Sequence, residues 1–235
     1  MSLDDHAKVS QAEWTEARKA LLKKEKEFTR LRDELSAARR ALPWTKVDKR
    51  YDFDTTKGKR TLAELFDDKS QLVVYHFMFD PTWEAGCKSC SFWADNFERN
   101  VIHLAHRDVK MMAISRAPLA KLTAFAKRLG WTFEWASSFE SDFNYDYGVS
   151  FTPEQVASGK VEYNFVVQDA WGTETPGISV FYKDARGEVF RTYSAYSRGL
   201  DMMNAAYHYL DLVPKGRDES DGNMAWLRLR DAYEK

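Results

Sequence analysis

The only two cysteines of the chain, Cys87 and Cys90, lie three positions apart, between two predicted elements. The preceding segment, 71–79, is apolar and rich in β-branched and aromatic residues, which predicts a buried strand. From Ser91 to about His106, apolar residues recur at helical spacing. Two thiols at a helix start can close a small disulfide ring, and backbone N–H groups there favour a thiolate on the first cysteine. The pattern therefore predicts redox chemistry.

The composition indicates a globular protein and excludes several classes of partner. Of the 235 residues, 44% are hydrophobic and the net charge is −1, so nothing indicates nucleic acid or acidic lipid as a partner. Residues 1–6 have no basic start or apolar stretch, so we expect no secretory signal. No segment approaches the ~18 uninterrupted apolar residues of a membrane span. We therefore expect a cytoplasmic protein with a reducible dithiol.

The first 45 residues are predicted to form a helical arm. Ser10 and Glu13 have capping-box spacing, and Pro43 ends the helix. Apolar residues recur every seven positions, and a second seam is interrupted by Lys24. These residues are Trp14, Leu21, Phe28, Leu35 and Leu42, with Ala17, Leu31 and Ala38 in the second seam. The pattern fits either an arm packed on its own domain or a homodimer contact over about four heptads.

Residues 46–235 are predicted to form the second domain, in which strands alternate with helices. Strands are expected at 72–77, 109–115, 133–136, 161–167, 178–182 and 189–193. Helices are expected at 91–106, 118–129 and 200–212, with a further helical tail at 223–234. Residues 51–66 are expected to form a hairpin or small helix, and 151–160 an insertion with a brief helix. This order predicts an α/β fold around a mixed sheet.

A strand, a Cys-x-x-Cys pair and a helix in this order are typical of thioredoxin-like proteins. Residues 77–95, FMFDPTWEAGCKSCSFWAD, resemble a bacterial thioredoxin-like family of predicted dithiol–disulfide oxidoreductases, and segments 115–119, 141–149 and 212–217 are also similar to it. The resemblance implies a thioredoxin-like fold, a central mixed sheet flanked by helices, with the N-terminal helix added. It supplies no substrate, so a protein or a small-molecule thiol or disulfide remains open.

The redox interpretation gives each cysteine a role. Cys87, nearer the helix N-terminus, would attack a substrate disulfide, and Cys90 would resolve the mixed disulfide. Trp83 is either a wall of the substrate groove or a packed loop aromatic. Lys88 either stabilises the Cys87 thiolate or points into water. Glu84 is a candidate proton acceptor for Cys90, or otherwise an exposed loop carboxylate.

Thr175, Pro176 and Gly177 lie immediately before the segment 178–182, which is predicted as a strand. Thioredoxin-like folds place a cis-proline at this point, facing the cysteines, and the residue before it offers its backbone to a peptide or thiol. Thr175 and Pro176 are therefore candidate substrate-binding residues. An ordinary trans turn proline is the alternative.

The sequence leaves three alternatives to the redox function. A peroxiredoxin pocket, Pro-x-x-x-Thr-x-x-Cys, would need Pro and Thr where the chain has Asp80 and Glu84. A zinc site could use Cys87 and Cys90 with the histidines at 103 and 106, but the histidine spacing is one residue short and a continuous helix would hold them ~18 Å from Cys90. A redox-inert thioredoxin-like scaffold is the third. No phosphate-loop or serine-elbow motif is present, and we expect neither a cofactor nor a metal.

Overall fold

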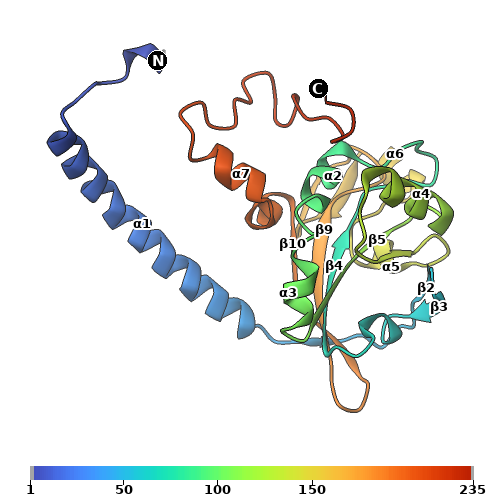
Figure 1. The fold of residues 1–235 in the computed structure, drawn as a ribbon. Coiled ribbons are helices and arrows are strands. Elements are labelled where there is room, and N and C mark those ends of the chain that lie inside the picture. Colours follow the sequence, from blue (N-terminus) through green and yellow to red (C-terminus); the bar gives the residue numbers. More distant parts are fainter. Residues whose placement is uncertain (1–2, 234–235) are drawn as a thin grey trace.

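The computed structural model describes residues 3–233 and builds most of them around one mixed sheet (Figure 1). In this part of the chain the sheet has eight strands in the order β1-β10-β9-β4-β5-β6-β2-β3, and β7 pairs with β8 separately. The strands are β1 Thr45–Lys46, β2 Asp52–Thr55, β3 Gly58–Thr61, β4 Gln71–His76, β5 Val109–Ser115, β6 Trp135–Ser137, β7 Lys160–Tyr163, β8 Val166–Asp169, β9 Gly177–Lys183 and β10 Val189–Tyr196. The α-helices are α1 Gln11–Arg40, α2 Lys88–Ala94, α3 Val101–Ala105, α4 Leu119–Leu129, α5 Phe143–Asp146, α6 Pro153–Ala157 and α7 Ala205–Leu210. Short 3-10 helices are η1 Leu3–Asp5, η2 Glu64–Phe66 and η3 Ser197–Met203.

The centre of the sheet has the topology of a thioredoxin-like fold. β4 and β5 are parallel and are connected through α2 and α3, whereas β9 pairs antiparallel with β4 and with β10. Helix α7 then follows β10. The order β5-β4-β9-β10, with the cysteine pair at the end of the loop that follows β4, confirms the predicted fold class.

Alternation along β4 assigns its side chains to two cores. Tyr75 and Phe77 pack on one face with residues of α2, α4 and α7, while Leu72 and Val74 pack on the other with η2 and α5. Because successive side chains point to opposite faces, Tyr75 lies on the same side of the sheet as the cysteine helix. The strand thus delivers an aromatic hydroxyl beneath the cysteine pair.

Helix α1 lies apart from the sheet (Figure 1). Ser10 accepts a hydrogen bond from the Glu13 backbone N–H and the Glu13 carboxylate accepts one from the Ser10 N–H, as the capping box predicts. None of the 30 residues of α1 is buried. Near its C-terminal end, the Arg39 guanidinium lies 5.5 Å from the centre of the Tyr193 ring. The arm is therefore not packed along its own domain.

The helix predicted over 91–106 is two helices instead. Residues 95–100 form turns between α2 and α3. The side-chain amide of Asn96 donates to the Phe92 carbonyl, and that of Asn100 donates to the Asn96 carbonyl. Asparagine side chains compete with the backbone for these carbonyls, which disfavours a continuous helix.

Three further segments differ from the sequence prediction. The strand expected at 161–167 is the β7–β8 hairpin, because Asn164 and Phe165 both have positive φ and reverse the chain. The helix expected at 200–212 is divided at Asn204, whose side chain caps α7 by accepting from the Tyr207 N–H. In the tail from residue 223 to 233 the structure has turns and no helix.

The residue before Cys87 has no room for a side chain. A Cβ on Gly86 would lie 2.6 Å from a Phe77 ring carbon and 2.8 Å from one of Phe125. We expect Gly86→Ala to destabilise the fold by about 1–3 kcal/mol, because overpacking must displace core aromatic rings. Urea denaturation checks this. Gly172→Ala is the control, since a Cβ there meets nothing within 4 Å, and equal stabilities of the two variants would contradict the packing.

Candidate functional site

The loop between β4 and α2 fixes both cysteines. The Cys87 N–H donates to the Met78 carbonyl at 3.0 Å, and the Cys87 carbonyl accepts from the Ser91 N–H and hydroxyl, each at 2.9 Å. Cys87 is the N-cap of α2 and is partly exposed, whereas Cys90 lies within the first turn and is 1% exposed. The two cysteines are 4.1 Å apart and unbonded. A modest side-chain rotation would close the disulfide.

Hydrogen bonds stabilise Cys87 as a thiolate. The thiol of Cys90 donates to it, and the backbone N–H groups of Cys90 and Ser89 and the Ser89 hydroxyl add to this effect. Together they outweigh burial and lower the pKa of Cys87 to about 6. Cys87 is therefore largely ionised at neutral pH, which is the state required of an attacking thiol.

Cys90 has the opposite character. Burial, the hydrogen bond that it donates to Cys87, and the negative charge of Cys87 raise the pKa of Cys90 well above its usual value. The backbone N–H of Met78 donates to the Cys90 sulfur at 3.4 Å, and a hydrogen bond with Tyr75 also acts to lower the Cys90 pKa. Cys90 is thus a protonated thiol with donors already in place for a thiolate.

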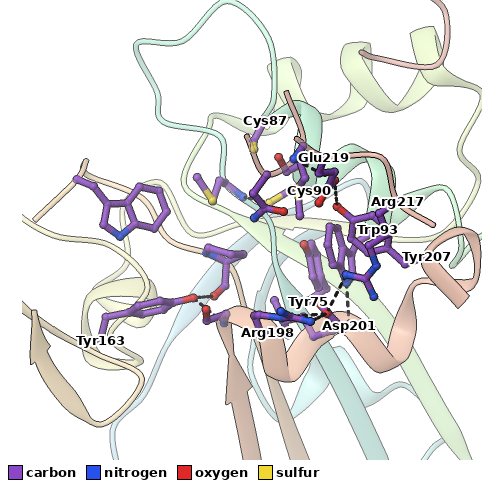
Figure 2. Close-up of a pocket in the computed structure, with 18 of the residues that line it drawn as sticks. Tyr75, Cys87, Cys90, Trp93, Tyr163, Arg198, Asp201, Tyr207, Arg217 and Glu219 are labelled. Atoms are coloured by element: carbon purple, nitrogen blue, oxygen red, sulfur yellow. Dashed lines mark hydrogen bonds and ion pairs between the residues drawn. The ribbon is translucent and has the colours of Figure 1, made fainter. Parts of the chain in front are cut away.

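A cavity of about 730 Å³ opens beside the pair. Figure 2 shows Cys87 and Cys90 at one end, with Tyr75, Trp93 and Tyr207 along the wall. The lining also contains Met78, Ser89, Tyr163, Gln168, Trp171, Pro176, Ser197, Arg198, Leu200, Asp201, Asp211, Arg217, Glu219, Asn223 and Met224. A volume of this size is typical of small-molecule sites.

The outer wall of the cavity comes from the C-terminal segment. A single oxygen of Glu219 accepts from the Tyr207 hydroxyl at 2.8 Å and from the Met224 N–H at 3.0 Å. Arg217 stacks over the Tyr207 ring at 3.8 Å and pairs with Asp211 at 2.8 Å (Figure 2). This wall of the cavity is therefore held together by charge-assisted hydrogen bonds.

Pro176 lines the cavity together with both cysteines. Its carbonyl accepts from the Tyr163 hydroxyl at 2.7 Å, and that hydroxyl accepts from the Ser197 N–H. Residues 3–233 contain no cis peptide bond, so the bond before Pro176 is trans here. Thr175 is buried beside it, outside the cavity lining, and its hydroxyl has no partner among the described residues.

Three other sequence candidates lie outside the cavity lining. Trp83 is half-buried and packs against the core, and its carbonyl accepts from the Lys121 ammonium at 2.8 Å. Lys88 is exposed on the first turn of α2, and Glu84 is exposed in the preceding loop. The donors identified at the Cys87 thiolate come from Ser89 and Cys90. Roles for Trp83 and Lys88 in substrate binding stay predictions.

A buried ionic cluster supports the site from below. Arg116, at the end of β5, pairs with Asp80 at 2.8 Å and with Glu174 at 2.5 Å. The carboxylates belong to the loop before Cys87 and the segment before Pro176, so one guanidinium joins the two segments that frame the cysteines. Because burial outweighs the attraction of the shared Arg116, the pKa of Glu174 is raised to about 7.

No pattern in the sequence indicated that Asp80 and Arg116 form an ion pair, or that Tyr75 and Tyr207 line the site. Strand alternation could have placed Tyr75 on the cysteine side of β4.

His76 is the hydrogen-bonded core histidine that a buried strand suggests. Its Nε2 lies 2.9 Å from the Ser179 hydroxyl, and burial lowers its pKa to about 3.

The structure does not assemble the ligands of the zinc alternative. Within residues 3–233, no three or more side chains of His, Cys, Asp or Glu gather as a metal-binding group. His103 lies on α3 and the histidine at 106 ends that helix, beyond the turns that follow α2.

Within residues 3–233, no helix combines the length and apolar character needed to cross a membrane.

The Cys87 pKa can be tested by alkylation. We expect the rate of iodoacetamide reaction at Cys87 to reach half its maximum near pH 6. Cys90→Ala removes the largest stabilising hydrogen bond and should move this midpoint to higher pH, whereas Cys90→Ser keeps an O–H donor and should move it less. Mass spectrometry of the labelled peptide gives the rates. A midpoint identical in all three proteins would show that Cys90 does not stabilise the thiolate.

Comparison with known proteins gives structural neighbours and a family. No curated protein matches the chain. Peroxidoxin BcpB from Mycobacterium tuberculosis is 15% identical, with a TM-score of 0.44, covering 70% of this chain and 94% of that one. Xanthomonas campestris peroxiredoxin Q is 14% identical, with a TM-score of 0.45 and coverages of 72% and 96%. A family model described as bacterial protein of unknown function (DUF899) matches residues 3–233, nearly the whole sequence, and the chain therefore belongs to this family.

Proposed function

We propose that this protein is a thiol–disulfide oxidoreductase in which Cys87 is the attacking thiol and Cys90 the resolving thiol. One observation carries the proposal: a partly exposed cysteine with a pKa near 6 lies 4.1 Å from a buried, protonated one. Asymmetry of this kind separates nucleophile from resolving thiol in dithiol chemistry. The cavity beside the pair provides space for a substrate.

The reaction begins at the Cys87 thiolate. Its sulfur attacks one sulfur of a substrate disulfide, forming a Cys87–substrate bond and breaking the substrate S–S bond. The departing thiolate takes a proton from solvent. This step also removes the negative charge of Cys87, which is one of the causes of the raised Cys90 pKa.

The second step uses Cys90. Its thiol releases a proton, and the resulting thiolate is stabilised by the Met78 N–H and Tyr75. It attacks the Cys87 sulfur, forms the Cys87–Cys90 disulfide and releases the second substrate thiolate. Two electrons pass from the protein dithiol to the substrate, and an external dithiol must return them. A reducing cytoplasm, as expected from the sequence, is part of this proposal.

The dimensions of the cavity favour a small-molecule disulfide as the substrate over a folded protein surface. The C-terminal segment, held by Glu219 and Arg217, occupies one side of the space next to Cys90. A protein substrate would have to reach Cys87 from the outer edge of the loop.

Trapping separates the two cysteines. We expect Cys90→Ser to accumulate a mixed disulfide at Cys87 when treated with glutathione disulfide, because the resolving step is blocked. Cys87→Ser should form none, since Cys90 is buried and protonated. Intact-mass spectrometry measures the adduct. Insulin, tested in parallel, should react more slowly if the cavity selects small disulfides.

Two results would reject the proposal. An adduct on Cys87→Ser and none on Cys90→Ser would reverse the roles. No adduct on either variant, with the fold verified by circular dichroism, would favour the redox-inert scaffold.

A further inference from the structure

Helix α1 carries an exposed apolar seam. Trp14, Leu21, Phe28 and Leu35 are each at least 50% exposed, with values of 54, 51, 67 and 50%. At ~1.5 Å per residue, the 30-residue helix is about 45 Å long. Because the structure shows no buried residue on α1, packing along its own domain does not cover this seam.

The spacing of the seam identifies the kind of partner that fits. Apolar residues repeat strictly every seven positions from Trp14 to Leu42, and the second seam follows three positions later. A sustained seven-residue repeat matches the 3.5-residue period of a supercoiled helix pair, not the 3.6-residue period of a helix on a globular surface. The partner is therefore another helix with the same repeat.

The flanking charges select a second copy of this chain, in parallel orientation. With Trp14 at position a, the residues at g include Glu13, Glu27 and Glu34, and the residues at e include Arg18, Arg32 and Arg39. In a parallel pair, each g residue faces the e residue five positions later in the other chain. All three pairs then join glutamate to arginine: Glu13 to Arg18, Glu27 to Arg32, and Glu34 to Arg39 of the second copy.

An antiparallel pair of α1 helices would lose these glutamate–arginine contacts. It places g beside g and e beside e, so each g glutamate would face a glutamate or an alanine, and the contacts between g glutamates and e arginines would be lost. Within the described residues of the chain, Glu27, Glu34 and Arg32 form no ion pair, and their charges are available to a partner. At the first pair, Arg18 already binds Glu25 at 2.8 Å and Glu13 caps the helix, so the later two pairs contribute more.

We propose that α1 forms a parallel two-stranded coiled coil between two copies of this protein, with its register set by the Glu27–Arg32 and Glu34–Arg39 contacts. Helix α1 leads directly to β1, which pairs with β10 at the edge of the sheet. A parallel coil therefore places both thioredoxin-like domains, and both cysteine cavities, at the same end. An antiparallel coil would separate them by about the length of the helix.

Charge reversal tests the pairing in the full chain. The double variant Glu27→Arg/Glu34→Arg should raise the dimer dissociation constant on the order of tenfold or more, because four attractive contacts become repulsive. Mixing it with Arg32→Glu/Arg39→Glu should restore the dimer. The control, Glu16→Arg/Asp33→Arg, makes the same change in charge at positions c and f, away from the seam, and should dimerise like the wild type.

Light scattering after size exclusion gives the mass of each protein. A monomeric wild type would overturn the proposal, and so would a Glu27→Arg/Glu34→Arg variant that dimerises as tightly as the control.

Cysteine crosslinking tests the orientation of the two helices. In a Cys87→Ser/Cys90→Ser background, Leu21→Cys should form a covalent dimer on mild oxidation, because equivalent a positions face each other in a parallel coil. A crosslink that forms only between Leu21→Cys and Leu35→Cys chains would show the antiparallel arrangement.

Discussion

The geometry of the site depends on the two ion pairs that the Arg116 guanidinium forms. It holds Asp80, from the loop that leads to Cys87, and Glu174, from the segment that leads to Pro176. Both carboxylates also accept hydroxyl hydrogen bonds, from Thr173 and Ser150 respectively. Removing one member of such a buried group leaves an unpaired charge, which typically costs about 3–5 kcal/mol. The cluster thus holds two loops against each other that the sheet alone would leave free.

The two cysteine side chains, Cys87 and Cys90, are chemically identical but lie in different environments. Cys87 is at the mouth of the helix, where N–H groups and a thiol donate to it, and Cys90 is one turn deeper in the core. The same hydrogen bond lowers the pKa of Cys87 and raises that of Cys90. The two thiols therefore differ in how readily they ionise, and the donors identified at the Cys87 thiolate are Cys90 and Ser89.

The sequence predicted what local patterns determine. Alternation and apolar runs located β4, β5, β9 and β10. The helix predicted over 118–129 is α4, which ends at Gly130 in the left-handed region. Local patterns did not predict where the helices are interrupted, because apolar spacing does not reveal side-chain hydrogen bonds. Those of Asn96 and Asn100 lie in the turns between α2 and α3, and that of Asn204 caps the start of α7. At the candidate site, the two cysteines and Pro176 were chosen as candidates from their positions relative to the predicted strands and helices.

Local sequence patterns could not predict the cavity wall formed by the C-terminal segment, nor the ionic cluster around Arg116. Arg116 meets Glu174 across 58 residues, and Glu219 meets Tyr207 across a segment with no regular helix period. Contacts of this kind depend on the tertiary fold and leave no periodic trace in the chain. The heptad seam of α1 is the converse case, since its pattern was evident in the sequence and the structure then left it uncovered.

Redox titration of the cysteine pair tests the central claim most directly. The protein is equilibrated with reduced and oxidised dithiothreitol or glutathione at fixed ratios, quenched with acid and alkylated, and the fraction of crosslinked peptide is measured by mass. The redox assignment predicts one two-electron transition, with a loss of two hydrogens and a Cys87–Cys90 crosslink. A pair that remains reduced across the whole range of potentials, in protein that is still folded, would contradict it.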